Sequence, residues 1–133
     1  MIVGTEWLIE AVGCDATNLR DESLLRDLLA RVISDLHLTS IGEVWHKFPG
    51  EAGVTGLIAL TESHLACHTY PEYGTATFNL YCCRTRPEWA WETNLIAALN
   101  AETVAVSRIS RGESAAQSKI QNPKSKMAMG GEL

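Results

Sequence analysis

The fold is decided by the stretch from residue 54 to residue 83, which reads VTGLIALTESHLACHTYPEYGTATFNLYCC. Its last nine residues alternate between the two faces of a predicted strand, and the apolar face consists of Ala76, Phe78, Leu80 and Cys82. Its first part, Val54–Thr61, is rich in β-branched and other apolar residues and predicts another strand. The stretch therefore predicts a sheet that covers a core with one face and keeps the other face polar.

Outside this stretch the sequence predicts three more strands. Ile41–Phe48 forms a predicted hairpin with Val54–Thr61, because Pro49, Gly50 and Gly53 mark a turn between the two runs. The remaining two predicted strands lie near the ends of the ordered chain, at Glu6–Val12 and Thr103–Ile109.

Two helices are also predicted. From Ser23 to Leu36 apolar residues recur at steps of three and four, which places one apolar stripe on a helix. A second helix is predicted with Pro87 in its first turn and Trp91, Leu95 and Ala98 or Leu99 on its apolar side, packed beside the first. The order β-α-β-β-β-α-β, without a crossover after each strand, predicts an α+β fold: a two-layer sandwich whose antiparallel sheet carries its helices on one face.

Composition predicts one domain over residues 1–112, followed by a disordered tail over residues 113–133. The formal net charge is −5 and the basic residues form no run, which argues against nucleic-acid binding. No stretch approaches the roughly 20 apolar residues of a membrane span, and Glu6 and Glu10 interrupt the apolar start. We therefore expect a cytoplasmic protein with no membrane partner, whose four cysteines are free thiols.

The segment from Leu60 to Gly74 is unusually rich in side chains capable of chemistry, and the residues alone leave three interpretations open. It can be an amphipathic strand and turn whose polar side chains are simply solvated. It can contribute His64 and His68 to a metal site with nearby cysteines, although no C-x-x-C pair is present. It can also use Ser63 as a nucleophile with one of these histidines as its base.

A resemblance adds to these alternatives. The central segment resembles the prokaryotic S-adenosylmethionine decarboxylase proenzyme family over Phe48–Cys83, through Glu62-Ser63-His64, His68-Thr69, Pro71-Glu72-Tyr73-Gly74 and a strand ending in Cys83. The resemblance implies that Ser63 cleaves the peptide bond after Glu62, which yields chains 1–62 and 63–133. It implies that this serine becomes a covalent pyruvoyl group, the only cofactor, with no metal. The implied activity is that of a carboxy-lyase that decarboxylates S-adenosylmethionine for spermidine biosynthesis.

The resemblance also implies roles for individual residues. It implies that His68 is the acid–base group of the cleavage, that Thr55 assists it in place of a serine, and that Cys83 returns a proton after decarboxylation. The alternation of the strand independently places Cys83 on its polar face. Implied contacts with the small-molecule substrate come from Phe48, Leu65, Tyr70 and Glu72. A homo-oligomer is implied as well, with a dimer of processed protomers as its smallest unit.

Three positions depart from the pattern of that family: Trp7, Asn79 and Arg84. Relatives with the same self-processing core act on basic amino acids, so decarboxylation of L-ornithine or L-arginine remains an alternative. A further alternative is an unprocessed relative that binds and regulates a partner. The presence of Ser63, His68 and Cys83 together argues against this last interpretation.

Overall fold

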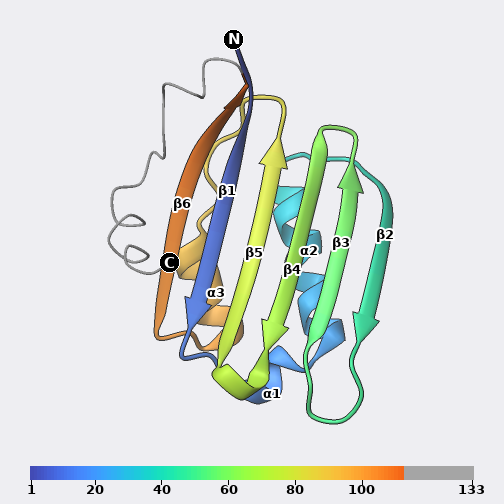
Figure 1. Ribbon diagram of the computed structural model, residues 1–133, viewed down its shortest axis with the longest axis vertical. Helices are drawn as coiled ribbons and strands as arrows, with labels where there is room; N and C mark the ends of the chain where they lie inside the picture. The colour runs from blue at the N-terminus through green and yellow to red at the C-terminus, as the bar shows by residue number, and fades with distance from the viewer. Residues whose placement is uncertain (113–133) are drawn as a thin grey trace.

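A six-stranded antiparallel sheet forms one layer of the protein and helices form the other, in a computed structural model that describes residues 1–112 (Figure 1). The strands are β1 (Ile2–Val12), β2 (Ser40–Lys47), β3 (Val54–Leu60), β4 (Ser63–Tyr70), β5 (Thr75–Cys82) and β6 (Thr103–Gly112). The helices are α1 (Ala16–Leu19), α2 (Glu22–Asp35) and α3 (Trp91–Leu99), with a 3-10 turn η1 (Pro71–Tyr73) between β4 and β5.

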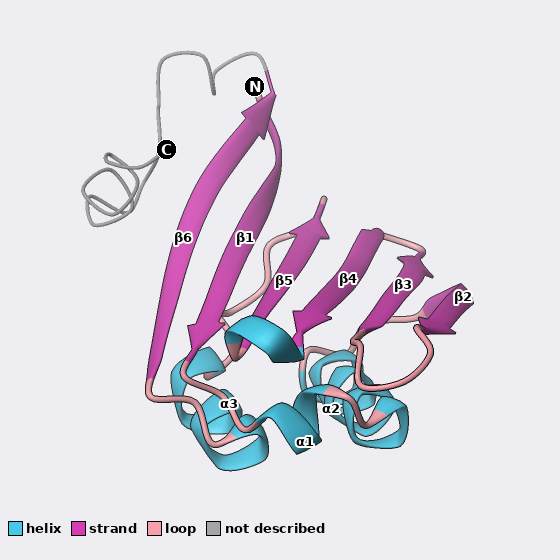
Figure 2. Cartoon of the chain, turned by 60° about the horizontal axis from the view of Figure 1, so that its bottom comes forward, coloured by secondary structure: helices cyan, strands magenta, loops and turns pink. Residues whose placement is uncertain are grey.

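The strands lie in the order β2-β3-β4-β5-β1-β6, so the first strand of the chain is inserted between the fifth and the sixth. All five neighbouring pairs are antiparallel. Figure 2 shows the helices gathered on one face of this sheet, while no helix among residues 1–112 covers the other face. The predicted α+β two-layer sandwich is therefore confirmed, as is the hairpin that β2 and β3 form.

The structure contains elements that the sequence did not predict, among them the short helix α1 at Ala16–Leu19. Ser63–Tyr70 was omitted from the predicted order of elements, although a strand was one interpretation of the segment, and it is a sixth strand in the middle of the sheet. The last helix begins at Trp91, so the prediction that Pro87 lies in its first turn was wrong. The reason lies in Trp89, which is buried before the helix starts and donates a hydrogen bond from Nε1 to Asp35 on α2 at 2.8 Å. The segment before α3 is therefore an anchored, irregular connection.

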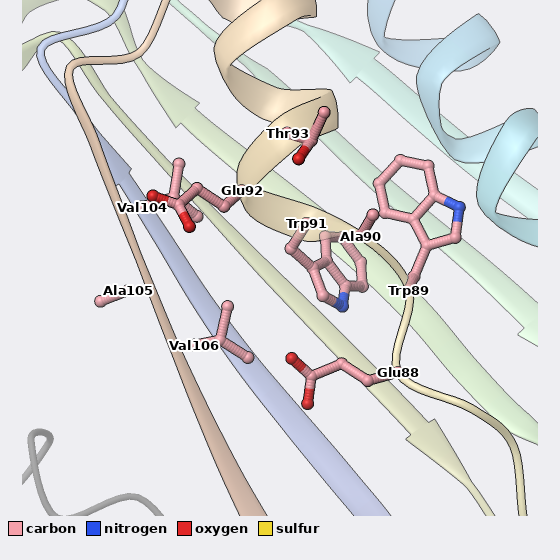
Figure 3. A pocket seen from close by; sticks show the side chains of 9 residues that line it. All are labelled: Glu88, Trp89, Ala90, Trp91, Glu92, Thr93, Val104, Ala105 and Val106. Carbon is pink, nitrogen blue, oxygen red and sulfur yellow. The ribbon is translucent and has the colours of Figure 1, made fainter.

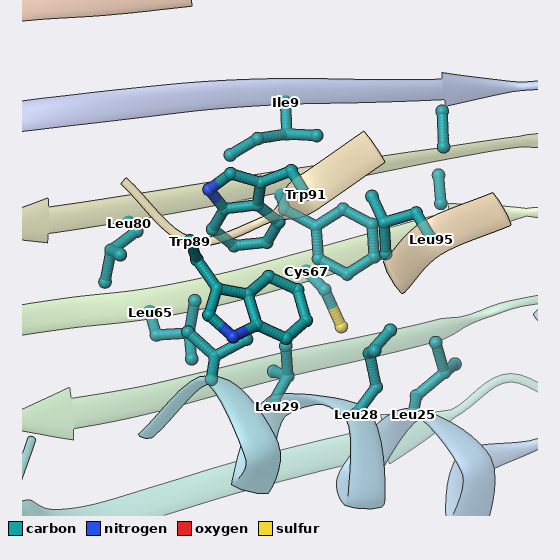
Figure 4. Close-up of a cluster of buried hydrophobic side chains, with 14 of the residues drawn as sticks. Ile9, Leu25, Leu28, Leu29, Leu65, Cys67, Leu80, Trp89, Trp91 and Leu95 are labelled. Carbon is teal, nitrogen blue, oxygen red and sulfur yellow. The ribbon is translucent and has the colours of Figure 1, made fainter. Parts of the chain in front are cut away.

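The core lies between the sheet and the helices (Figure 4). Trp91 is 1% exposed and packs against Phe78, with the ring centroids 5.9 Å apart, and against Trp89 at 4.9 Å. The strand β5 alternates buried and partly exposed residues along its whole length, as its sequence predicts. From α2 the core receives the apolar stripe of Leu25, Leu28, Leu29 and Val32.

One buried polar side chain ties the two layers together. The hydroxyl of Thr69 donates a hydrogen bond to the carbonyl of Leu19 at 2.7 Å and accepts one from the backbone N–H of Val54 at 2.9 Å. Because Thr69 is only 5% exposed, water cannot replace either bond. This side chain therefore fixes the lower end of β4, as drawn in Figure 1, against both α1 and β3.

Within residues 1–112, no helix has both the length and the apolar character needed to cross a membrane. The predicted tail over residues 113–133 lies outside the described residues.

Candidate active site

The predicted cleavage site lies in the tight turn between β3 and β4. Leu60 pairs with Ser63, so only Thr61 and Glu62 connect the two strands. Ser63 has a φ of 130°, a region that side chains other than glycine rarely adopt. Such a backbone costs of order 1–3 kcal/mol and persists only where the surroundings hold it in place. The backbone of Ser63, directly after the predicted cleavage site, is therefore strained.

The carbonyl that precedes Ser63 is already polarised by a hydrogen bond. The backbone N–H of Cys83 donates to the carbonyl oxygen of Glu62 at 3.0 Å. An attack by a hydroxyl on this carbonyl would place negative charge on that oxygen, where a positioned N–H stabilises it. The geometry thus supplies one donor of an oxyanion site, and it comes from the backbone of the residue that follows β5.

The side chain of Glu62 is held as well. Nη2 of Arg86 donates to both of its carboxylate oxygens, at 2.6 and 2.7 Å, and Nε of Arg84 lies 3.6 Å from one of them. The Glu62 and Arg86 side chains are only 15% and 19% exposed. Sequence reasoning missed Arg86, and no motif or spacing in the sequence singles it out.

A second group of predicted residues lies toward the other end of the strands. Nδ1 of His68 lies 3.2 Å from the hydroxyl of Thr55, its cross-strand neighbour on β3. Tyr70, at the end of β4, is 39% exposed, and Phe48, after β2, is 45% exposed. Glu72 is exposed in the turn η1. The structure therefore brings His68 and Thr55 into direct contact and leaves the aromatic candidates open to solvent.

The two groups are separated within one chain. His68 is five residues after Ser63 on the same strand, and at about 3.3 Å per residue this corresponds to roughly 16 Å. A proton acceptor must come within about 3 Å of the hydroxyl that it serves, or act through one water. His68 of this chain therefore does not reach Ser63 of the same chain.

Leu65 does not lie with the other predicted substrate residues. Its side chain is fully buried between the sheet and the helices, as Figure 4 shows. A strand alternates its faces, so Leu65 points into the core while His64 and His68 occupy the uncovered face. The Leu65 side chain is therefore part of the core, and its contact with substrate stays a prediction.

The four cysteines, all within the described residues, are free, and they differ sharply in environment. Burial raises the pKa of the Cys67 thiol to about 12 and that of Cys82 to about 11. Cys83 is the exposed one, as the strand pattern predicts. Among residues 1–112, no three histidine, cysteine or acidic side chains gather closely enough to hold a metal ion.

A cavity of about 200 Å³ is lined by the neighbouring strands β4, β5 and β1 and includes His68 and Asn79 in its lining. Oδ1 of Asn79 lies 2.7 Å from Nε2 of His64, and Nδ2 of Asn79 donates to the Glu6 carboxylate at 2.6 Å. Asn79, one of the positions that depart from the family pattern, therefore links β5 to β4 and β1. Another cavity, of about 470 Å³, lies beside the start of α3, and none of the predicted site residues lines it (Figure 3).

Comparisons with known proteins match this arrangement. The model of the S-adenosylmethionine decarboxylase family matches residues 5–112. An S-adenosylmethionine decarboxylase proenzyme of Prochlorococcus marinus is 35% identical over 126 residues, which cover 92% of this chain and 99% of that protein. A proenzyme 2 of the same description from Halalkalibacterium halodurans is 33% identical, covering 94% of this chain and 97% of that protein. The crystal structure of the adenosylmethionine decarboxylase from Aquifex aeolicus superposes with a TM-score of 0.72 and 30% identity, over 84% of this chain and 92% of that one.

Proposed function

Because the chain belongs to the S-adenosylmethionine decarboxylase family, we propose that it cleaves itself before Ser63 and then decarboxylates S-adenosylmethionine, for spermidine biosynthesis in the cytoplasm. The observation that carries the proposal is the turn at the cleavage site. At this turn the N–H of Cys83 donates a hydrogen bond to the Glu62 carbonyl, and the next residue, Ser63, has a positive φ of 130°. The four free cysteines accord with a cytoplasmic setting, where thiols stay reduced.

The cleavage needs only the chain and water. The Ser63 hydroxyl attacks the Glu62 carbonyl carbon, the peptide C–N bond breaks, and an ester forms while the amino nitrogen gains the proton. Removal of the Cα proton of Ser63 then breaks the bond from Cβ to the ester oxygen and releases the Glu62 carboxylate. Water finally replaces the nitrogen, which leaves as ammonia. The product chains would be 1–62 and 63–133, and the second would begin with a pyruvoyl group.

The residues present fit that group. Its precursor Ser63 stands at the start of β4, beside Cys82 across the strand pair and next to the exposed Cys83. When formed, the group supplies an electron sink for the carbon–carbon bond that loses carbon dioxide. Cys83 is the side chain beside it that can hold a proton and return it to the substrate carbon. We therefore assign this proton transfer to the Cys83 thiol.

We further propose that two copies of the chain complete each site. The separation of about 16 Å between Ser63 and the His68–Thr55 pair supports this. In a twofold dimer, each surface patch of one copy meets its complement on the other, so His68 of one protomer can serve Ser63 of its partner. The exposed Phe48, Tyr70 and Glu72, at the same end as His68, would then bind the substrate. Aromatic rings and a carboxylate suit its sulfonium cation.

The choice of substrate rests on the relatives. Those named above are described as S-adenosylmethionine decarboxylases, which favours this substrate over L-ornithine or L-arginine. The experiment that tests the proposal combines two measurements. Purified protein should separate under denaturing conditions into pieces of residues 1–62 and 63–133, whereas the S63A variant should remain whole. Carbon dioxide should be released from labelled S-adenosylmethionine and not from ornithine or arginine; an uncut wild-type chain would refute the proposal.

A further inference from the structure

Arg86 contacts Glu62 directly beside the proposed cleavage site. Its Nη2 lies 2.6 and 2.7 Å from the two carboxylate oxygens, and both side chains are mostly buried. Arg84, two residues earlier, approaches the same carboxylate only to 3.6 Å and is 72% exposed. Exposed ion pairs contribute little binding energy because solvent screens them. Of these two arginines, Arg86 is therefore the one that restrains Glu62.

Arg86 is itself held in place by the segment that carries it. Cys82 is fully buried before it and Trp89 is 5% exposed after it, so both ends of the short connection are anchored. Pro87 follows at once and confines the backbone of Arg86 to extended conformations. Nη1 of Arg86 also donates a hydrogen bond to the carbonyl of Thr85 at 3.1 Å. Because the guanidinium of Arg86 is restrained in this way, it can fix the position of the Glu62 carboxylate.

The same segment therefore holds residue 62 at two points. The N–H of Cys83 binds the carbonyl of Glu62, and Arg86 binds its carboxylate. Residue 62 cannot rotate within the turn unless one of these contacts breaks. A strained backbone such as that of Ser63 persists only under restraints of this kind.

We propose that Arg86 is a positioning residue for self-cleavage, which rests on the cleavage proposed above. By holding the Glu62 side chain, it keeps the scissile carbonyl aligned with both the Ser63 hydroxyl and the Cys83 N–H. Its positive charge also offsets the Glu62 carboxylate, which would otherwise repel the negative charge that develops on the carbonyl oxygen. Neither effect requires Arg86 to touch the reacting atoms.

The test compares the rates at which R86Q, R86K and R84Q cleave themselves, followed by intact mass after synthesis. A displacement of about 1 Å at a reacting centre can slow a reaction by about 100-fold. We therefore expect R86Q to cleave about 10- to 100-fold more slowly than wild type. R86K, which keeps the charge but has a shorter and differently shaped head group, should also be slow, by about 5-fold or more. The matched control R84Q should stay within about 2-fold of wild type.

Two further measurements separate positioning from stability. The double variant E62Q/R86Q leaves no buried charge without a partner, so it should fold even if R86Q does not, and it should still cleave slowly. Hydroxylamine cuts esters, so rapid hydroxylamine cleavage of R86Q between residues 62 and 63 would show that the attack had already occurred. That result would overturn the proposal, as would cleavage of R86Q or the double variant at the wild-type rate. An uncut wild-type chain would instead overturn the cleavage proposal itself.

Discussion

Two inactive variants should restore cleavage to each other if the site is shared between copies. The S63A chain lacks the attacking hydroxyl but keeps His68, while the H68A chain keeps Ser63 and lacks the imidazole. Neither should cut itself: S63A not at all, and H68A about 100-fold or more below wild type, the usual loss when an acid–base group is removed. In a mixed dimer, however, Ser63 of the H68A chain faces the intact His68 of its partner.

The expected extent follows from the geometry. His68 and Ser63 of one chain are roughly 16 Å apart along β4, far beyond hydrogen-bond reach, so each intact site needs both chains. Random pairing of equal amounts places about half of the H68A chains in mixed dimers, and each mixed dimer has one intact site. About half of the H68A chains should therefore be cut, and none of the S63A chains.

The assay is co-expression of the two chains with different tags, followed by intact mass of each. A double variant S63A/H68A in place of S63A is the matched control, because it forms the same dimers without an intact site. The reasoning fails if H68A stays whole while mixed oligomers are recovered. It fails equally if H68A alone is cut at the wild-type rate.

Three other variants test the remaining assignments. C83A keeps its backbone N–H, so cleavage should proceed near the wild-type rate while carbon dioxide release falls about 100-fold or more. T69V leaves two buried backbone groups without a hydrogen-bond partner, the N–H of Val54 and the carbonyl of Leu19, and should lose about 2–4 kcal/mol of unfolding free energy in urea. The control T103V changes an exposed strand residue and should alter this free energy by less than about 0.5 kcal/mol. The pKa of Cys67 is raised from 9.0 to about 12 by burial, so the unfolded chain loses this proton first. The contribution of the buried Cys67 thiol to stability is full below about pH 9 and is lost as pH rises toward 12. C67A should therefore lose less stability than wild type as pH rises above about 9.

Much of the fold could be predicted because periodicity reports which side of an element is buried. The alternation in Thr75–Cys82 and the apolar stripe of α2 were confirmed, since each element has one buried face. The strand β4 was omitted from the predicted order because its buried residues include Cys67 and Thr69, which are not typical core residues. Thr69 is buried because its hydroxyl makes two hydrogen bonds, with the N–H of Val54 and the carbonyl of Leu19. Those partners come from distant segments, and no local pattern reveals them.

The candidate site was predictable in its residue types but not in its geometry. A sequence places Ser63 and His68 five positions apart, and only a strand conformation turns that spacing into a separation of roughly 16 Å. Arg86 could not be predicted, because its role depends on the path of an irregular segment between Cys82 and Trp89. Leu65 shows the converse, since its place in the motif suggested a contact with substrate but did not reveal that its side chain is buried.

The strand order has a consequence for the protein after cleavage. The piece 1–62 would contain β1, β2 and β3, and the piece 63–133 would contain β4, β5 and β6. In the sheet these pieces interleave, because β1 lies between β5 and β6 while β3 borders β4. They cannot separate without breaking three strand pairings. Refolding of the cut protein becomes a bimolecular reaction, so its melting temperature should rise with protein concentration, whereas that of an uncut monomer would not.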